Sequence, residues 1–133
     1  MPEFQAVGKM AEAAGVLVVE DDPELRDFAA DLLDSLGYRT IVAASGDAAL
    51  SILQAQRGID VIFTDLVMPG NLDGLALADE VRRLSLGIKI VFTSGYPGHA
   101  GLRQRLPGRE EIFLRKPYRA RELAAAIERA LAG

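Results

Sequence analysis

The stretch "VLVVEDDPELRDF", residues 16–28, decides the fold of this chain. Its first four residues are apolar and mostly β-branched, in the continuous pattern of a strand that is covered on both faces. Three acids follow, and Asp22 fits the N-cap of a helix with Pro23 at its first position. A buried strand that leads directly into a helix predicts an α/β unit with acidic side chains at the carboxyl end of the strand.

The alternation of apolar runs and helical periodicity continues along the chain. The other predicted strands are residues 38–43, 60–65, 89–94 and 111–116, and the predicted helices run from Asp22 to Gly37, Ser45 to Gly58, Asp73 to about Gly87, and Arg119 to Leu131. We expect a further, short or mobile helix in residues 97–108, because each of the glycines there costs about 1 kcal/mol relative to Ala. Five β-α repeats predict a parallel sheet with helices on both faces, since parallel neighbours need right-handed crossovers.

The composition excludes several classes of function. The chain has 15 Lys and Arg against 19 Asp and Glu, and a net charge of −4 offers no electrostatic footprint for DNA or RNA. Without cysteine, thiol catalysis and thiolate metal sites are excluded, and the single histidine, His99, cannot build a zinc site. No apolar run approaches the roughly 20 residues that span a bilayer, so no membrane insertion is expected.

The length of 133 residues predicts one domain. We expect it to comprise residues 15–133, and residues 1–14 to be a flexible tail, a linker from a longer protein or partly a cloning remnant. The N-terminal residues have neither the basic region nor the apolar segment of a secretion signal, so a cytoplasmic protein is expected.

Polar residues that could carry chemistry stand at the predicted strand ends. Glu20 and Asp21 follow the first strand, Asp65 ends the third, Thr93 lies near the end of the fourth, and Lys116 ends the fifth. Taken alone, each has an ordinary structural explanation, since acids favour helix starts and threonine favours strands. Together they favour a functional site, because ligands of such sheets bind beyond the carboxyl ends of the strands.

The grouped carboxylates require a positive partner. Two unit charges about 4 Å apart repel by about 4 kcal/mol at an effective dielectric of about 20, and three carboxylates make three such pairs. Mg²⁺, or Mn²⁺ in its place, would offset this repulsion in an all-oxygen site, and Lys116 supplies a further charge. An aspartate beside such an ion, a lysine and a hydroxyl is equipped to attack phosphorus.

The motifs "VLVVEDD", "DVIFTDLVMP", "IVFTSGYP" and "FLRKPY", in this order and spacing, resemble the signature of response-regulator receiver domains of two-component signalling. The resemblance covers about residues 15–132. It implies an α/β fold of the flavodoxin-like (βα)5 type, a doubly wound five-stranded parallel sheet with the strand order 2-1-3-4-5.

The resemblance implies a phosphoacceptor and a metal site. Asp65 matches the phosphoacceptor. Glu20 and Asp21 match the acidic pair that holds Mg²⁺, Asp21 directly and Glu20 through water. Asp65 itself and the backbone carbonyl of Val67 match the remaining metal ligands of the protein.

The resemblance also implies residues that respond to the phosphoryl group. Thr93 matches the switch hydroxyl, Lys116 the lysine of the site, and Phe113 the rotating switch aromatic. The Lys116–Pro117 bond would be cis, which is otherwise the minority state of such bonds. "SGYP" is similar to receivers of hybrid histidine kinases and brings Tyr96 near the site, where it would close over the phosphoryl group. Aromatic packing is the competing explanation for Tyr96 and Phe113.

Two features depart from the common pattern of these receivers. The loop "MPGNLDG", residues 68–74, is one residue longer than the commoner MPxxDG form, which would alter the region beside the acceptor. Tyr118 replaces the usual Phe after the Lys-Pro pair, a mild change.

The leading hypothesis is a phosphorylation switch rather than an enzyme with turnover. A histidine kinase or histidine phosphotransfer protein would donate a phosphoryl group to Asp65, and the chain would catalyse only this step and a slow dephosphorylation. A downstream protein would read the surface formed by the helix in 97–108, the strand 111–116 and the final helix. A weak homodimer stays open, as does the choice between a stand-alone regulator and a receiver of a hybrid kinase.

Three other functions compete with the phosphorylation switch. Phosphohydrolases with an aspartyl nucleophile resemble DxDx[TV] enzymes, but Val67 offers no acid for a leaving group two residues after Asp65. A degenerate receiver that acts only as an interaction module would not need the complete set of polar residues at the strand ends. A nucleotide enzyme has little support, because "AVGKMA" lacks the glycine and Ser/Thr of a phosphate-binding loop.

Overall fold

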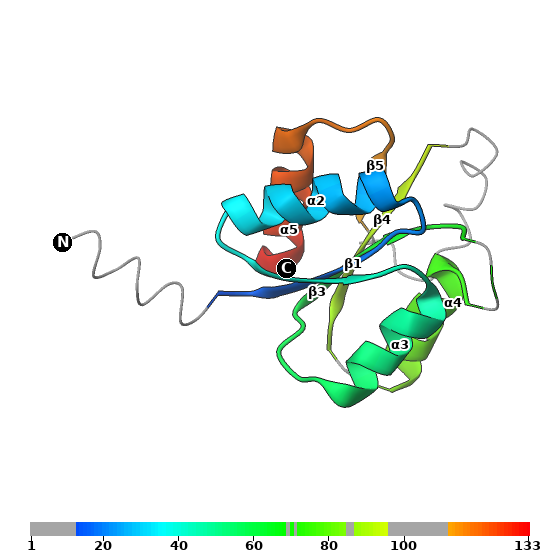
Figure 1. Cartoon of the computed structure of the whole chain (residues 1–133). Coiled ribbons are helices and arrows are strands. Elements are labelled where there is room, and N and C mark those ends of the chain that lie inside the picture. Colours follow the sequence, from blue (N-terminus) through cyan, green and yellow to red (C-terminus); the bar gives the residue numbers. More distant parts are fainter. Residues whose placement is uncertain (1–12, 69, 71, 85–86, 96–111) are drawn as a thin grey trace.

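The structure, a computed structural model, describes residues 13–68, 70, 72–84, 87–95 and 112–133 (Figure 1). Its strands are β1 (Gly15–Val19), β2 (Arg39–Ala43), β3 (Val61–Asp65), β4 (Lys89–Ser94) and β5 (Ile112–Arg115). Its helices are α2 (Pro23–Ser35), α3 (Gly46–Ala55), α4 (Gly74–Arg83) and α5 (Ala120–Ala132). All the strand pairs are parallel, and the sheet order β2-β1-β3-β4-β5 confirms the predicted fold class.

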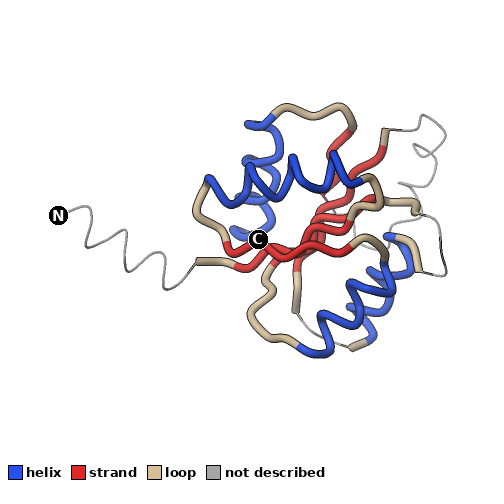
Figure 2. The backbone as a smooth tube through the Cα atoms, in the orientation of Figure 1, coloured by secondary structure: helices blue, strands red, loops and turns tan. Residues whose placement is uncertain are grey.

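The sheet lies between two layers of helices (Figure 2). Helices α2 and α5 cover one face, and α3 and α4 cover the other (Figure 1). Alternate residues of β1 divide between the layers: Leu17 and Val19 pack in the core with α3 and α4, whereas Val16 and Val18 pack with α2 and α5. Burial on both faces explains why this strand is apolar throughout instead of alternating with polar residues.

Short polar side chains start three of the helices, as predicted. The Oδ1 atom of Asp22 accepts hydrogen bonds from the first-turn backbone of α2, Ser45 Oγ from Ala48 N of α3, and Asp73 Oδ1 from Ala76 N of α4. These bonds satisfy backbone N–H groups that have no partner within the helix. Two helix ends differ from the prediction: α3 ends at Ala55 and α4 at Arg83, before the glycines that were expected to stop them.

Some predictions fall on other parts of the chain. The helix expected in 97–108 and most of the tail expected in 1–14 lie outside the described residues, so the domain boundary stays a prediction. Among the described helices, none combines the length and the apolar character that crossing a bilayer requires.

Candidate functional site

The turn after β1 brings Glu20 under the surface at the carboxyl end of the sheet. Glu20 is 5% exposed, and its backbone N–H donates to Ala43 O of β2. Its Oε2 atom accepts a hydrogen bond from Asp22 N at 3.1 Å. The next residue, Asp21, is exposed, so the two neighbouring acids have different environments. The turn thus presents one carboxylate that is fixed by the protein and one that faces solvent.

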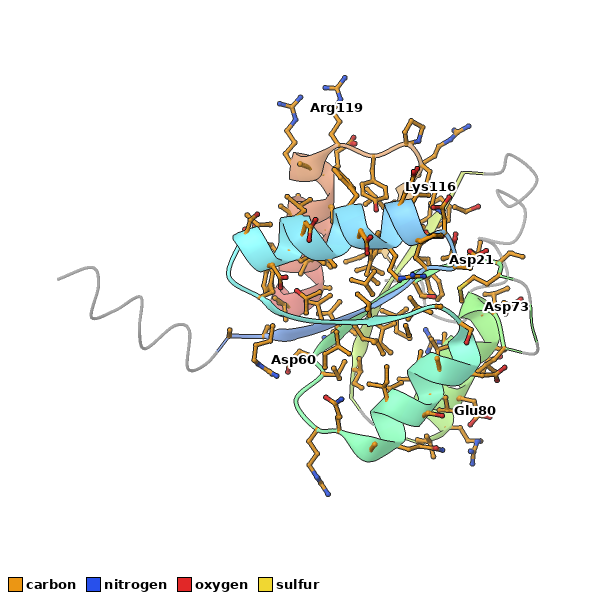
Figure 3. The ribbon with its side chains drawn as sticks, viewed as in Figure 1. Asp21, Asp60, Asp73, Glu80, Lys116 and Arg119 are labelled. Carbon is orange, nitrogen blue, oxygen red and sulfur yellow. The ribbon has the colours of Figure 1, made fainter. Side chains whose placement is uncertain are left out.

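Asp65 ends β3 beside this turn. It is 6% exposed, and Lys116 Nζ lies 3.0 Å from its Oδ2 atom. The same Nζ lies 2.9 Å from Glu20 Oε1, so one ammonium bridges two carboxylates from different strands. Figure 3 shows Lys116 and Asp21 at one end of the sheet and Asp60, which precedes β3, at the other. Three strand ends therefore meet in one charged cluster.

Burial and charge act in opposite directions on these groups. Burial raises the pKa of Glu20, although hydrogen bonds from Lys116 and from the Asp22 backbone act against the rise. Desolvation lowers the pKa of Lys116, but its hydrogen bond to Glu20 and the attraction of Asp65 outweigh this effect, and the net shift is upward. The lysine therefore keeps its positive charge well above neutral pH.

The acidic residues fit a small divalent cation. One carboxylate oxygen each from Glu20, Asp21 and Asp65 lies within 4.8 Å of the others. A site made of oxygen atoms, with one member open to solvent, suits Mg²⁺, which usually retains several waters. The donor set and the excess of carboxylates over the single lysine agree with the cofactor expected from the sequence.

Thr93 lies next to the acceptor in the sheet. Its Cα pairs with that of Asp65 in the ladder between β3 and β4. The residue is 2% exposed, and its Oγ1 atom is buried without a hydrogen bond to any described residue. Buried hydroxyls nearly always have a partner, so this one is suited to a group that enters the site.

The other residues predicted for the site lie in different surroundings. Val67 follows β3 and is 37% exposed, and Phe113 is partly buried against the core layer of α3 and α4. The Lys116–Pro117 peptide bond is cis. Tyr96 lies outside the described residues, so its closure over the site stays a prediction.

A close backbone contact fixes the loop that follows the acceptor. Gly74 N donates to Leu66 O, and Leu66 N donates to Thr93 O. A Cβ atom on Gly74 would collide with the backbone O of Asp65. Only glycine therefore lets α4 start against the end of β3. Two residues of the loop "MPGNLDG", Pro69 and Asn71, lie outside the described residues, so the effect of its extra residue beside the acceptor stays a prediction.

Sequence reasoning missed Arg26 beside the cluster, and it noted Tyr118 only as a mild departure from the family pattern. Arg26, in α2, donates from Nη1 to Glu20 O at 3.0 Å. Tyr118 packs edge-on against Phe63 with ring centroids 5.6 Å apart, and it also contacts Phe28. Burial raises the pKa of Tyr118 to about 12. The position of Arg26 one helical turn after the N-cap residue was a usable signal, because side chains there can reach back to the preceding turn.

A shallow pocket opens beside the lysine. It has a volume of about 340 Å³ and is lined by Leu25, Phe28, Gly95, Lys116, Pro117 and Tyr118. Its walls are mostly apolar side chains that stay partly exposed, such as Phe28 at 47%. Of the charged cluster, the pocket contacts Lys116, and α2 contributes Leu25 and Phe28 to its wall.

Known proteins resemble the chain over most of its length. The family model for the response regulator receiver domain matches residues 16–128. The chain is 36% identical over 123 residues to the sensor kinase CckA of Brucella abortus, which covers 92% of this chain and 13% of CckA. It is 31% identical over 116 residues to the response regulator receiver protein CpdR of the same organism, covering 87% of this chain and 95% of CpdR. A solved response regulator receiver protein from Sinorhizobium medicae superposes with a TM-score of 0.84 at 25% identity, over 92% of this chain and 98% of that one.

Proposed function

The chain belongs to the family of response regulator receiver domains, the signalling modules of two-component systems, and we propose that it accepts a phosphoryl group on Asp65. The donor is the phosphohistidine of a histidine kinase or of a histidine phosphotransfer protein. The observation that carries the proposal is the position of the buried Asp65 carboxylate, 3.0 Å from Lys116 Nζ and within the acidic cluster.

The transfer step uses groups of this chain in separate roles. An oxygen of the Asp65 carboxylate attacks phosphorus, the new O–P bond forms, and the N–P bond of the donor breaks with its electron pair going to the imidazole nitrogen. The ammonium of Lys116 stabilises the negative charge of the phosphoryl oxygens. The carboxylates of Glu20, Asp21 and Asp65 and the carbonyl of Val67 would hold Mg²⁺, or Mn²⁺ in its place. When bound, this ion supplies further positive charge to the phosphoryl oxygens.

The phosphorylated state differs from the resting state at two side chains. The Thr93 hydroxyl, which has no partner among the described residues, hydrogen-bonds a phosphoryl oxygen. Phe113 then turns further into the space that the moving threonine leaves. A downstream protein recognises the altered surface of β5, α5 and the segment 97–108. In this scheme the chain performs only its own phosphorylation and a slow dephosphorylation.

The test is a labelling experiment on the purified protein. Wild type is incubated with MgCl₂ and phosphoramidate, and intact mass and hydroxylamine sensitivity of the label are measured. Wild type should gain one hydroxylamine-sensitive phosphoryl group, and Asp65→Ala should gain none. Asp47→Ala, which removes an exposed carboxylate at the start of α3, is the matched control and should be labelled like wild type. Equal labelling of Asp65→Ala and wild type would exclude Asp65 as the acceptor.

A further inference from the structure

Helix α2 is connected to the acidic turn by the side chain of Arg26. Its guanidinium reaches back along the helix, and Nη1 donates to the backbone O of Glu20 at 3.0 Å. The backbone N–H of the same residue donates to Asp22 O at 2.9 Å, within the helix. Arg26 thus contacts the turn at its first residue through the side chain and at its last residue through the main chain.

Every polar atom of Glu20 has a protein partner. The partners of its N, O, Oε1 and Oε2 atoms are, in that order, Ala43 O, Arg26 Nη1, Lys116 Nζ and Asp22 N. A charged donor strengthens the bond to the backbone carbonyl, because hydrogen bonds from ionised groups are roughly twice as strong as neutral ones. Glu20 is therefore fixed in both its side chain and its main chain.

Asp21 contrasts with this arrangement. Its side chain is exposed, and its carboxylate makes no hydrogen bond to another residue that the structure describes. One of its oxygens nevertheless lies within 4.8 Å of carboxylate oxygens of Glu20 and Asp65. Since no described side chain holds it, the direction of this carboxylate depends on the backbone of the turn between Glu20 and Asp22.

We propose that Arg26 is a positioning residue for the divalent cation, an inference that rests on the proposed function. By holding Glu20 O, the guanidinium fixes the turn so that the Asp21 carboxylate points toward Asp65 before an ion arrives. Hydrogen bonds behind metal ligands commonly have this effect, and their loss lowers metal affinity by about 10–100-fold.

The sign of the effect separates positioning from simple electrostatics. The guanidinium bonds the backbone of the acidic turn, and a positive charge there repels an incoming cation. Removal of its charge alone would therefore make Mg²⁺ bind more tightly. Loss of a positioning contact makes Mg²⁺ bind more weakly. Variants that lose the contact must therefore show reduced Mg²⁺ affinity in spite of their lower positive charge.

The experiment measures Mg²⁺ affinity by calorimetric titration of MgCl₂, and stability by urea unfolding without divalent ions. Arg26→Met and the shorter Arg26→Gln both lose the contact and should bind Mg²⁺ about 10-fold more weakly than wild type. Arg26→Lys keeps a charged donor and should recover most of the affinity. Arg83→Met is the matched control: it removes an exposed arginine of α4 whose partner is Glu80, and Mg²⁺ affinity should stay at the wild-type value.

Each outcome decides for or against the positioning role. Unchanged or tighter Mg²⁺ binding by Arg26→Met overturns it, and so does an equal loss of affinity in Arg83→Met. If Arg26→Met does not fold, the Mg²⁺ affinity of Arg26→Gln decides by the same criterion. Labelling of wild type at Asp65 together with unchanged Mg²⁺ binding in the Arg26 variants rejects this inference alone, whereas absence of label on wild type rejects the proposed function.

Discussion

Lys116 Nζ lies 3.0 Å from Asp65 Oδ2, and the two residues are 51 positions apart in the chain. The same nitrogen bonds Glu20, which is 96 positions away. Both carboxylates are almost fully buried, so their charges are poorly screened by water. The lysine therefore offsets the repulsion between two acids that folding brings together.

Lys116→Met should lower the free energy of unfolding by about 1–3 kcal/mol in the absence of divalent ions, because two buried carboxylates lose a charged donor. Added MgCl₂ should narrow the difference from wild type, because the carboxylates of the variant lack the competing ammonium and bind the cation more tightly, so the variant gains more stability from it. Urea unfolding with and without MgCl₂ measures both effects. Lys89→Met, at an exposed lysine of β4, should leave stability nearly unchanged. A difference that MgCl₂ does not reduce contradicts a cation site between these carboxylates.

Thr93→Val should leave the stability of the unphosphorylated protein unchanged or raise it by up to about 1 kcal/mol, because the Oγ1 atom it removes is buried without a described partner. The adjacent strand provides the control. Thr64 Oγ1 donates to Asp65 O at 2.9 Å, so Thr64→Val should lose about 1 kcal/mol. Thr93→Val should also reduce the change that phosphorylation causes at the protein surface. Amide hydrogen exchange of α5, measured with and without phosphorylation, gives the size of this change. If Thr93→Val and Thr64→Val lower the free energy of unfolding equally, the Thr93 hydroxyl does have a partner in the unphosphorylated protein.

Tyr118 should make stability fall at alkaline pH. Burial raises the pKa of its phenol to about 12 in the folded chain, whereas free tyrosine ionises near pH 10. The stabilisation is complete below the pKa of the unfolded chain and is lost as the pH rises through the folded value. Tyr118→Phe should therefore have a shallower loss of stability between about pH 10 and 12, and it should lack one late step in the tyrosinate absorbance titration. Tyr38→Phe should retain that step.

Gly74→Ala should lower stability by about 1–3 kcal/mol, because the new Cβ collides with the backbone O of Asp65. Labelling at Asp65 should also slow, since the collision displaces the acceptor strand. Gly37→Ala is the control: Gly37 has a φ of 97° and open space around its Cα. It should lose about 1–2 kcal/mol from backbone strain and retain the wild-type labelling rate. Normal labelling of Gly74→Ala would show that the contact does not position the acceptor.

Much of the fold could be predicted from local patterns. The apolar runs located the strands to within about two residues, and capping by Asp22, Ser45 and Asp73 located three helix starts. Helix ends were predicted less well, because Gly58 and Gly87, which have positive φ, lie three and four residues after the last residues of α3 and α4. Ligands of such sheets bind beyond the carboxyl ends of the strands, and this tendency also identified the acids and the lysine that form the charged cluster.

The roles of individual neighbours could not be predicted in this way. Nothing in the local sequence distinguishes Glu20, which is buried and bonded to Lys116, from the exposed Asp21 beside it. The position of Arg26 shows that its side chain can reach back to the preceding turn, but it does not show that the carbonyl of Glu20 is the acceptor. The sequence around Tyr118 does not show that its ring packs on Phe63.

The sequence by itself determined which residues form strands, which side chains start helices, and which polar groups stand at strand ends, because each depends on periodicity and on neighbours a few positions away. Only the tertiary structure decided which of those groups touch. Contacts such as Lys116 with Glu20 and Asp65 depend on the register and order of parallel strands joined by long crossovers. A shift of one residue in that register would send the same side chains to opposite faces of the sheet.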